Sequence, residues 1–526
     1  MSDLDRSEET ADSDDRPNIV VLYIDDLDFD EIEPYSNSPG DYPSNTGAFQ
    51  AGALTPKEGI EWMWYDNPKM MTPNIQRLSE EGGRFDRFYV TTSICTPSRY
   101  SLFTGRYATR SAQFLEKYPA GGPSNLEWDA MLGATENNIF KMLHGQDYRT
   151  ALIGKWHNGI PVGTEAQSVR DLEEHHQALE YLSNVDNFGI DHVDRVIFAN
   201  PMPFNLEWIT EGAVNYLGTE ASGEGKDPFF LYVAIPVPHH QYEANWLEED
   251  PRAMPGVIED LTEDEVPTVQ PSRQEVMERA KAAGLPDRNA AAGWLDDSVG
   301  AILGALEKTG RAENTLVFLI SDHQSRGKFD NYEGCRVPAI VRWPGVVEPG
   351  TVYTGLFANV DLAPTILAAA GGQPDDVEPP FDGSSFLPVL EGEQPESEFR
   401  DHVLLEVHSS RAIVTPKWKY IANRPTAEIQ KAMDEDAQKA EEETRRRVVS
   451  WNGRANWNEH SDGVLFDADS LFPHYFDTDQ LYDMENDIYE QRNLLSENPE
   501  VVEELRKILS EELESMPHTF GEFKTN

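Results

Sequence analysis

The feature of this sequence that most constrains its fold is a series of short, continuously apolar runs separated by helical stretches. The runs are Asn18–Ile24, Thr150–Ile153, Phe229–Ile235, Leu316–Ile320 and Ala339–Arg342. Uninterrupted runs of this length, rich in β-branched residues, are typical of strands buried on both faces. Helical spacing of apolar residues occurs between them, at Thr72–Glu81 and at Asn289–Lys308. The alternation predicts an α/β fold whose large, mostly parallel mixed sheet is flanked by helices.

The character of the chain changes after about residue 391. Shorter, alternating strands are expected in HVLLEVHS and RAIVTPKWKYIAN, and helices are expected over residues 426–447 and Pro499–Leu513. We therefore expect a large α/β domain over residues 17–395. A smaller C-terminal α+β subdomain over residues 396–526 should contain a small antiparallel sheet and a terminal helix. The acidic composition of residues 1–16 predicts a disordered tail.

The charge of the chain is strongly negative. Asp and Glu number 94 against 43 Lys and Arg, which gives a net charge of −51. Such a surface repels phosphate backbones and anionic lipids, which argues against nucleic-acid and membrane partners. The acidic residues are spread along the chain, which predicts adaptation to concentrated salt, where at roughly 1 M the Debye length is about 3 Å. An acidic protein from ordinary salt is the alternative.

Two observations predict a cytoplasmic protein. The sequence has two cysteines, Cys95 and Cys335, which excludes a disulfide framework. The N-terminal stretch MSDLDRSEETADSDDRP lacks the basic and apolar segments of a signal peptide, and no apolar run approaches the length of a membrane span.

Acidic residues follow two of the predicted strands at the point where each strand ends. Asp25 and Asp26 follow the first strand, and Asp322 and His323 follow LVFLIS. Ligands of parallel sheets bind beyond the carboxyl ends of the strands, so these side chains can converge if the chain turns there. Three carboxylates and one further donor suit a hard divalent cation such as Ca²⁺ or Mg²⁺. The alternative is that the carboxylates cap the turns after the strands.

The segment CTPSRYSLFTG begins with Cys95 and is predicted to open a helix. Pro97 suits the first turn, and Arg99 lies one turn beyond Cys95 on the same face. A helix N-terminus beside a guanidinium stabilises an anionic nucleophile. From these residues alone, Cys95 is either a reactive thiolate or a buried structural cysteine.

The pattern Cys-x-Pro-x-Arg within CTPSRYSLFTGRY, preceded by TPNIQRLSEEGGRF, closely resembles the signature of the formylglycine-dependent sulfatases. The resemblance implies an alkaline-phosphatase-like fold and a catalytic domain over residues 17–395. It also implies that a formylglycine-generating enzyme converts Cys95 to formylglycine, the nucleophile that hydrolyses a sulfate monoester. PNIVVLYIDDL and TLVFLISDHQ are similar to the two metal strands of this family. They imply that Asp25, Asp26, Cys95, Asp322 and His323 bind Ca²⁺, with Mg²⁺ as the alternative.

Three further segments extend the resemblance. DYRTALIGKWHNG implies roles for Lys155 and His157, which lie two apart in a strand-like segment and so should project to one face. PFFLYVAIPVPHH implies His239, with His240 as an adjacent competitor, and GKFDNYEGCRVPAIVRWPG implies Lys328. The implied roles are sulfate binding by both lysines, stabilisation of the ionised nucleophile by Arg99, a general acid at His239 or Lys328, and a base at His157.

Some residues depart from the family pattern. His323 stands where Asn is usual, and Cys335 replaces a usual Gly. Cys335 is expected to lie near enough to the site to affect it. Residues 28–69 and 250–287 resemble insertions that shape the pocket. A phosphonate monoester or phosphodiester hydrolase of the same superfamily, and an inactive relative with unmodified Cys95, are the rival interpretations. Sulfated saccharides, aryl sulfates and small alkyl sulfates all remain open as substrates.

Overall fold

The structure is a computed structural model, and it describes most of the chain. The described residues are 16–35, 71–159, 171–198, 204–219, 228–239, 245–254, 258–285, 290–325, 327–444, 447, 449–451, 453 and 472–524. The predicted disordered tail, apart from Arg16, and the predicted insertion beyond Tyr35 lie outside the described residues.

The centre of the molecule is a nine-stranded sheet with the strand order β4-β3-β5-β1-β6-β7-β2-β8, in which β9 also pairs with β2. Its strands are β1 (Asn18–Ile24), β2 (Gly83–Tyr89), β3 (Arg149–Lys155), β4 (His192–Ile197), β5 (Phe229–Ile235), β6 (Thr315–Ser321), β7 (Arg336–Arg342), β8 (Thr351–Tyr353) and β9 (Phe357–Ala358). β7 runs antiparallel to β6 and β2, and the other pairs are parallel. The five apolar runs of the sequence are therefore all strands of one mixed, mostly parallel sheet.

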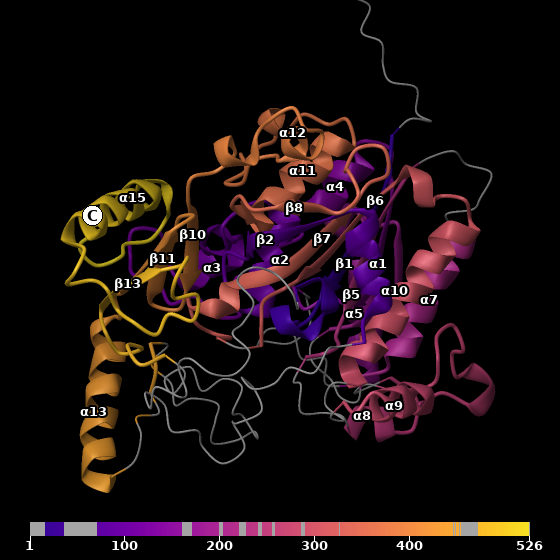
Figure 1. The fold of residues 1–526 in the computed structure, drawn as a ribbon, viewed down its shortest axis with the longest axis horizontal. Helices are drawn as coiled ribbons and strands as arrows, with labels where there is room; N and C mark the ends of the chain where they lie inside the picture. The colour runs from indigo at the N-terminus through magenta and orange to yellow at the C-terminus, as the bar shows by residue number, and fades with distance from the viewer. Residues whose placement is uncertain are drawn as a thin grey trace, which may run out of the picture.

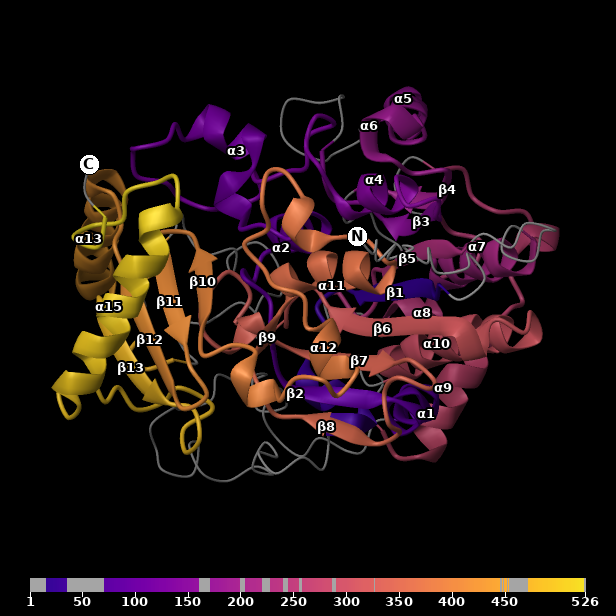
Figure 2. The ribbon, with the colours of Figure 1, turned by 90° about the horizontal axis from the view of Figure 1, so that it is seen from above.

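Helices cover both faces of this sheet (Figures 1 and 2). The helices in this part of the chain are α1 (Pro73–Glu81), α2 (Cys95–Thr104), α3 (Ala112–Lys117), α4 (Ile139–His144), α5 (Leu172–Leu182), α6 (Val185–Phe188), α7 (Leu206–Thr219), α8 (Asn245–Glu248), α9 (Arg273–Ala282), α10 (Ala290–Lys308), α11 (Leu362–Ala369) and α12 (Leu387–Leu390). Successive residues of β1 alternate between two cores because side chains of a strand point to opposite faces. Tyr23 packs into a core shared with α2, α4 and α11, whereas Leu22 packs into a core shared with α1, α7 and α10.

A separate unit lies at one side of the large sheet (Figures 1 and 2). Its four-stranded antiparallel sheet has the order β10 (Val403–Val407), β11 (Ser410–Val414), β12 (Trp418–Asn423) and β13 (Asp479–Asp483). The terminal helix α15 (Pro499–Ser515) packs Leu505, Leu509 and Leu513 against it. The predicted fold class is confirmed, while the boundary at residue 395 stays a prediction.

Two predicted segments differ in detail from the structure. The helix expected over residues 426–447 is α13 (Ala427–Glu443), which ends at Thr444 in a left-handed conformation. The stretch 250–287, expected as an insertion, contains α9, whose N-terminus is capped by Ser272. Among the described helices, none has the length and apolarity that a bilayer crossing requires.

Candidate active site

Three buried carboxylates meet where β1 and β6 end. Asp25 and Asp26 follow β1, and Asp322 follows β6; each has an exposed fraction of 0%. The backbone of Asp26 is left-handed (φ 59°), and its N–H donates to Oδ1 of Asp322 at 3.1 Å. This turn interrupts the alternation of the strand, so consecutive carboxylates can face one place. The structure thus brings together acidic residues that are almost 300 positions apart in the sequence.

Arg99 links the ends of β1 and β6 through hydrogen bonds to carboxylates of both. Its side chain, also 0% exposed, donates to Asp25 Oδ1 at 3.2 Å and to Asp322 Oδ2 at 3.0 Å. The same guanidinium donates to the hydroxyl of Tyr232 at 3.1 Å and lies 5.2 Å from the ring centroid of Tyr23. Arg99 is therefore held by two carboxylates and two aromatic rings.

The carboxylates have unequal proton affinities. Burial alone would raise the pKa of Asp25, but Lys155, His239 and Arg99 bring that pKa well below its usual range. Burial and the neighbouring Asp25 carboxylate raise the pKa of Asp322 well above its usual range. Like charges are thus forced together at the strand ends, which is typical of a site built for an additional cation.

Cys95 is the first residue of α2 and lies inside this cluster. Its side chain is 1% exposed, and Sγ is 3.2 Å from Nε2 of His323. Burial raises the pKa of the Cys95 thiol, against the opposing influence of Lys155 and Lys328. As an unmodified side chain, Cys95 is therefore a buried thiol rather than the thiolate that its sequence position permits.

Two buried lysines complete the cationic half of the site. Lys155, the last residue of β3, donates to Asp25 Oδ2 at 2.5 Å. Lys328 donates to both carboxylate oxygens of Asp26, at 3.0 and 2.9 Å, and its Nζ is 3.3 Å from Nε2 of His239. Although burial works in the opposite direction, the Asp26 carboxylate raises the pKa of Lys328, so this ammonium stays charged.

His157 lies beyond the end of β3, in a left-handed backbone conformation (φ 48°). The sequence predicted that strand alternation would point His157 and Lys155 to the same face. That reasoning is wrong, because the strand ends at Lys155. Burial, reinforced by the charges of Lys155 and Arg99, lowers the pKa of His157 well below its usual range. The imidazole is therefore neutral at physiological pH.

Two overlapping groups of side chains have the spacing of a metal site. Within each group, the ligand atoms lie within 4.8 Å of one another. The groups are Asp25, Asp26, Cys95 and His239, and Cys95, Asp322 and His323. The carboxylate oxygens fit a hard cation such as Ca²⁺ or Mg²⁺. Three carboxylates here balance the three cations Arg99, Lys155 and Lys328, so a divalent ion would make the site net positive and suited to an anion.

Other site contacts were not predicted from the sequence. Tyr232, which accepts a hydrogen bond from Arg99, is the one polar residue of the apolar strand β5. A buried hydroxyl requires a partner, which is the signal that could have found this contact. His239, which the resemblance implied as a general acid, also belongs to one of the two groups with metal-site spacing. Cys335 is fully buried, with Sγ 3.7 Å from the backbone oxygen of Asp330. His240 lies outside the described residues.

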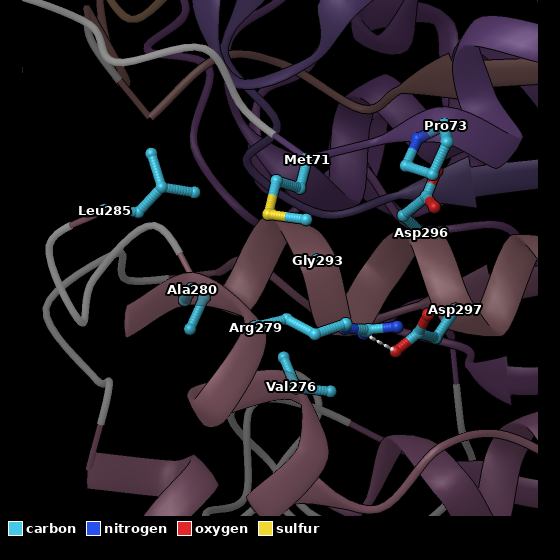
Figure 3. Close-up of a pocket in the computed structure, with 10 residues that line it drawn as sticks. Met71, Pro73, Val276, Arg279, Ala280, Leu285, Gly293, Asp296 and Asp297 are labelled. Atoms are coloured by element: carbon cyan, nitrogen blue, oxygen red, sulfur yellow. Dashed lines mark hydrogen bonds and ion pairs between the residues drawn. The ribbon is translucent and has the colours of Figure 1, made fainter. Parts of the chain in front are cut away.

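A separate hollow of about 140 Å³ lies between α1, α9 and α10 (Figure 3). It is lined by apolar side chains such as Val276 and Leu285, with an ion pair between Arg279 and Asp297 at its edge. Asp296, in the same wall, accepts hydrogen bonds from the backbone N–H groups of Asn74 and Ile75. The polar groups of this hollow thus serve to join α1, α9 and α10.

Comparisons with known proteins identify relatives of this chain. A family model described as Sulfatase matches residues 17–372, and one described as N-sulphoglucosamine sulphohydrolase, C-terminal, matches residues 326–445. Arylsulfatase A of Bos taurus is 27% identical over 420 residues, which cover 72% of this chain and 68% of that protein. Steryl-sulfatase of Rattus norvegicus is 26% identical over 415 residues, which cover 64% of this chain and 68% of that protein.

A solved structure from work on glycosaminoglycan metabolism by Bacteroides thetaiotaomicron shares the fold. It superposes with a TM-score of 0.60 at 20% identity, over 94% of this chain and 99% of that one. The similarity extends through both sheets of the molecule.

Proposed function

Since the chain belongs to the sulfatase family and is a sulfuric ester hydrolase, we propose that it acts through a formylglycine made from Cys95 and a divalent cation. The proposed reaction converts a sulfate monoester to an alcohol and inorganic sulfate. The observation that supports it most is the convergence of three buried carboxylates and three buried cations around Cys95 at the start of α2.

Asp25, Asp26, Asp322 and His323 would hold the cation, with Ca²⁺ preferred over Mg²⁺ for its tolerance of irregular oxygen ligands. The ion would supply a positive charge against a sulfate oxygen and favour the ionised form of the residue-95 hydrate. A hydrated aldehyde at residue 95 supplies one hydroxyl oxygen for attack on sulfur and a second hydroxyl through which sulfate is later released.

The side chains of this chain perform the remaining steps. Lys155 and Lys328 bind the oxygens of the sulfate group, which carry charge in a loose transition state. The leaving oxygen takes its proton from Lys328 or His239, whose Nζ and Nε2 atoms are 3.3 Å apart. The pKa of Lys328 is raised, so its ammonium carries the proton before the reaction. His157, held neutral by burial, accepts the proton of the second hydroxyl. Arg99 keeps the carboxylates in place through its contacts with Asp25 and Asp322.

Side-by-side hydrolysis of the sulfate and phosphate esters of 4-nitrophenol tests this function. We expect the sulfate ester to be preferred, and we expect both chelation of divalent ions and Cys95→Ala to abolish its turnover. Preferential hydrolysis of the phosphate ester, or full sulfatase activity in Cys95→Ala, contradicts the proposal.

We further propose that the enzyme works in concentrated salt. The chain carries a net charge of −51, which surrounds the cationic site with a negative field. At low ionic strength the Debye length is long, so this field repels anionic esters before they reach the site. kcat/KM should therefore rise at least tenfold, as an order of magnitude, between dilute buffer and molar KCl. An activity maximum in dilute buffer contradicts salt adaptation. Residence in the cytoplasm remains a prediction from the sequence.

A further inference from the structure

The loop that carries Lys328 contains a strained residue. Gly327 and Phe329, on either side of Lys328, both have left-handed backbone conformations (φ 68° and 70°). Glycine adopts this conformation readily, whereas a bulky residue such as phenylalanine adopts it rarely and at a cost in free energy. A strained residue keeps its conformation only where surrounding contacts hold it. The contacts around Phe329 therefore help to determine where the preceding Lys328 lies.

Ser93 makes three hydrogen bonds to the two residues that follow Lys328. The N–H of Phe329 donates to the backbone oxygen of Ser93 at 3.1 Å. The N–H of Asp330 donates to the hydroxyl of Ser93 at 2.9 Å, and this hydroxyl donates to the backbone oxygen of Asp330 at 2.7 Å. Ser93 is 0% exposed, so water does not compete for these bonds. Together they hold the strained residue and its successor in place.

Ser93 also belongs to the segment of the nucleophile. It lies two residues before Cys95, which begins α2, and the residue between them, Ile94, is the N-cap of this helix. The backbone oxygen of Ile94 accepts the N–H of Ser98 at 3.0 Å, which fixes the segment to the first turn of α2. A short path of backbone and hydrogen bonds thus joins residue 95 to Lys328 through Ser93.

Other contacts of the same loop lead to the C-terminal unit. The amide of Asn331 donates to the hydroxyl of Ser410 at 2.9 Å, and the hydroxyl of Tyr332 donates to Oε1 of Gln480 at 2.7 Å. These bonds fix the later part of the loop to β11 and β13, whereas the bonds of Ser93 fix its earlier part to the segment of residue 95.

We propose that Ser93 is a positioning residue that sets the distance between Lys328 and the nucleophile at residue 95. The inference rests on the proposed function, in which Lys328 binds an oxygen of the sulfate group while the hydrate at residue 95 attacks its sulfur. These two atoms are bonded to each other, so the lysine and the nucleophile must be placed together. A misplacement of about 1 Å between such groups costs up to about 100-fold in rate. Ser93 therefore acts on the reaction without touching the ester.

A double-mutant cycle of Ser93→Ala and Lys328→Ala tests this inference. Ser93→Ala removes the hydroxyl bonds to Asp330, and kcat/KM for 4-nitrophenyl sulfate should fall about tenfold. In the Lys328→Ala background the same change should lower kcat/KM by less than about twofold, because no ammonium remains to be positioned. A loss through general destabilisation would be the same in both backgrounds.

The dissociation constant of inorganic sulfate, measured by calorimetry, gives the same cycle where turnover is too slow to assay. Ser93→Ala should weaken sulfate binding only in the chain that retains Lys328. If Ser93→Ala does not fold, Ser93→Thr takes its place in the cycle, because the added methyl group displaces the same hydroxyl in a fully buried position.

Thr365→Val is the matched control. Thr365 is also 0% exposed, and its hydroxyl likewise bridges backbone groups, donating to the oxygen of Asp361 at 2.7 Å and accepting the N–H of Phe386 at 2.9 Å. It joins α11 to the segment before α12. The folded fraction of Thr365→Val should keep kcat/KM within about twofold of wild type.

Equal losses from Ser93→Ala in both backgrounds would overturn the positioning role, and so would wild-type kcat/KM in Ser93→Ala. A loss in Thr365→Val as large as that in Ser93→Ala would overturn it as well. All three outcomes leave the proposed function standing. Wild-type protein that carries the aldehyde at residue 95 and does not hydrolyse 4-nitrophenyl sulfate would refute the proposed function and this inference with it.

Discussion

One lysine–carboxylate pair of the strand-end cluster and one of the C-terminal unit are both buried, and they differ in what surrounds them. Lys155 and Asp25 are both 0% exposed and lie in the strand-end cluster, where Asp25 also pairs with Arg99. Lys419 and Glu490 are 1% and 0% exposed, are joined at 2.6 Å, and lie in the C-terminal unit. The first pair belongs to a network of several positive and several negative side chains. Binding of a cation or an anion can change which of these side chains pair with one another. The second is a close pair that joins β12 to the chain after β13.

The difference teaches that burial of charge alone does not identify a catalytic site. In the strand-end cluster, removal of one cation leaves other cations against the same carboxylate, so function should suffer more than stability. In the C-terminal unit, removal of Lys419 leaves Glu490 buried against the acidic neighbours Glu333 and Asp487, so stability should suffer more than function.

The largest expected effect is on activity, in Lys155→Met. The loss of one ammonium from the position proposed to bind sulfate should lower kcat/KM by about 10³-fold, as when one charge-stabilising donor is removed. The free energy of unfolding should change by less than about 1 kcal/mol, because Arg99 still neutralises Asp25. Steady-state kinetics and denaturant unfolding on one preparation measure both quantities. If the variant were strongly destabilised while its folded fraction kept full activity, Lys155 would serve stability rather than catalysis, which would contradict the comparison.

Lys419→Met is the mirror-image variant. It should lower the free energy of unfolding by about 3 kcal/mol, because a buried carboxylate loses its partner. kcat of the folded fraction should stay within about twofold of wild type, since this pair lies outside the charge cluster. A stable Lys419→Met protein with strongly reduced kcat would show that the second pair also serves catalysis.

The pH dependence of stability sharpens the comparison further. Burial raises the pKa of Glu490 to about 7, although Lys419 opposes the shift. The folded state therefore holds a proton that the unfolded chain releases near pH 4.5, so the associated stability is present below that pH and is lost as pH rises through about 7. Between pH 5 and 8 the free energy of unfolding should fall by about 2 kcal/mol less in Glu490→Gln than in the wild type. Denaturant unfolding at each pH measures this difference. An unchanged slope in the variant would place the titration elsewhere.

The smallest expected effect concerns the support behind the charge cluster. Tyr232→Phe removes the hydroxyl that accepts a hydrogen bond from Arg99 while keeping the ring, so kcat should fall about tenfold with KM unchanged. The matched control is Tyr216→Phe, a buried tyrosine of α7 on the opposite face of the sheet. A rise in KM with constant kcat would show that Tyr232 acts on the substrate rather than on Arg99.

Sequence patterns predicted the sheet because continuous apolar runs specify buried strands, and strand ends then located Asp25, Asp26 and Asp322. The motif around Cys95 predicted the nucleophile and Arg99. Sequence did not predict the left-handed turns at Asp26 and His157, because periodicity gives no information on residues beyond a strand end. It also missed Lys419–Glu490 and the Tyr232 contact, since pairings between distant segments depend on packing.

Peptide mass spectrometry of residue 95, in protein purified from its native host, tests the central claim most directly. The account predicts that most molecules carry the lighter aldehyde in place of the cysteine thiol, and that activity increases in proportion to this fraction across preparations. Fully active protein in which Cys95 is entirely an unmodified thiol would contradict the account.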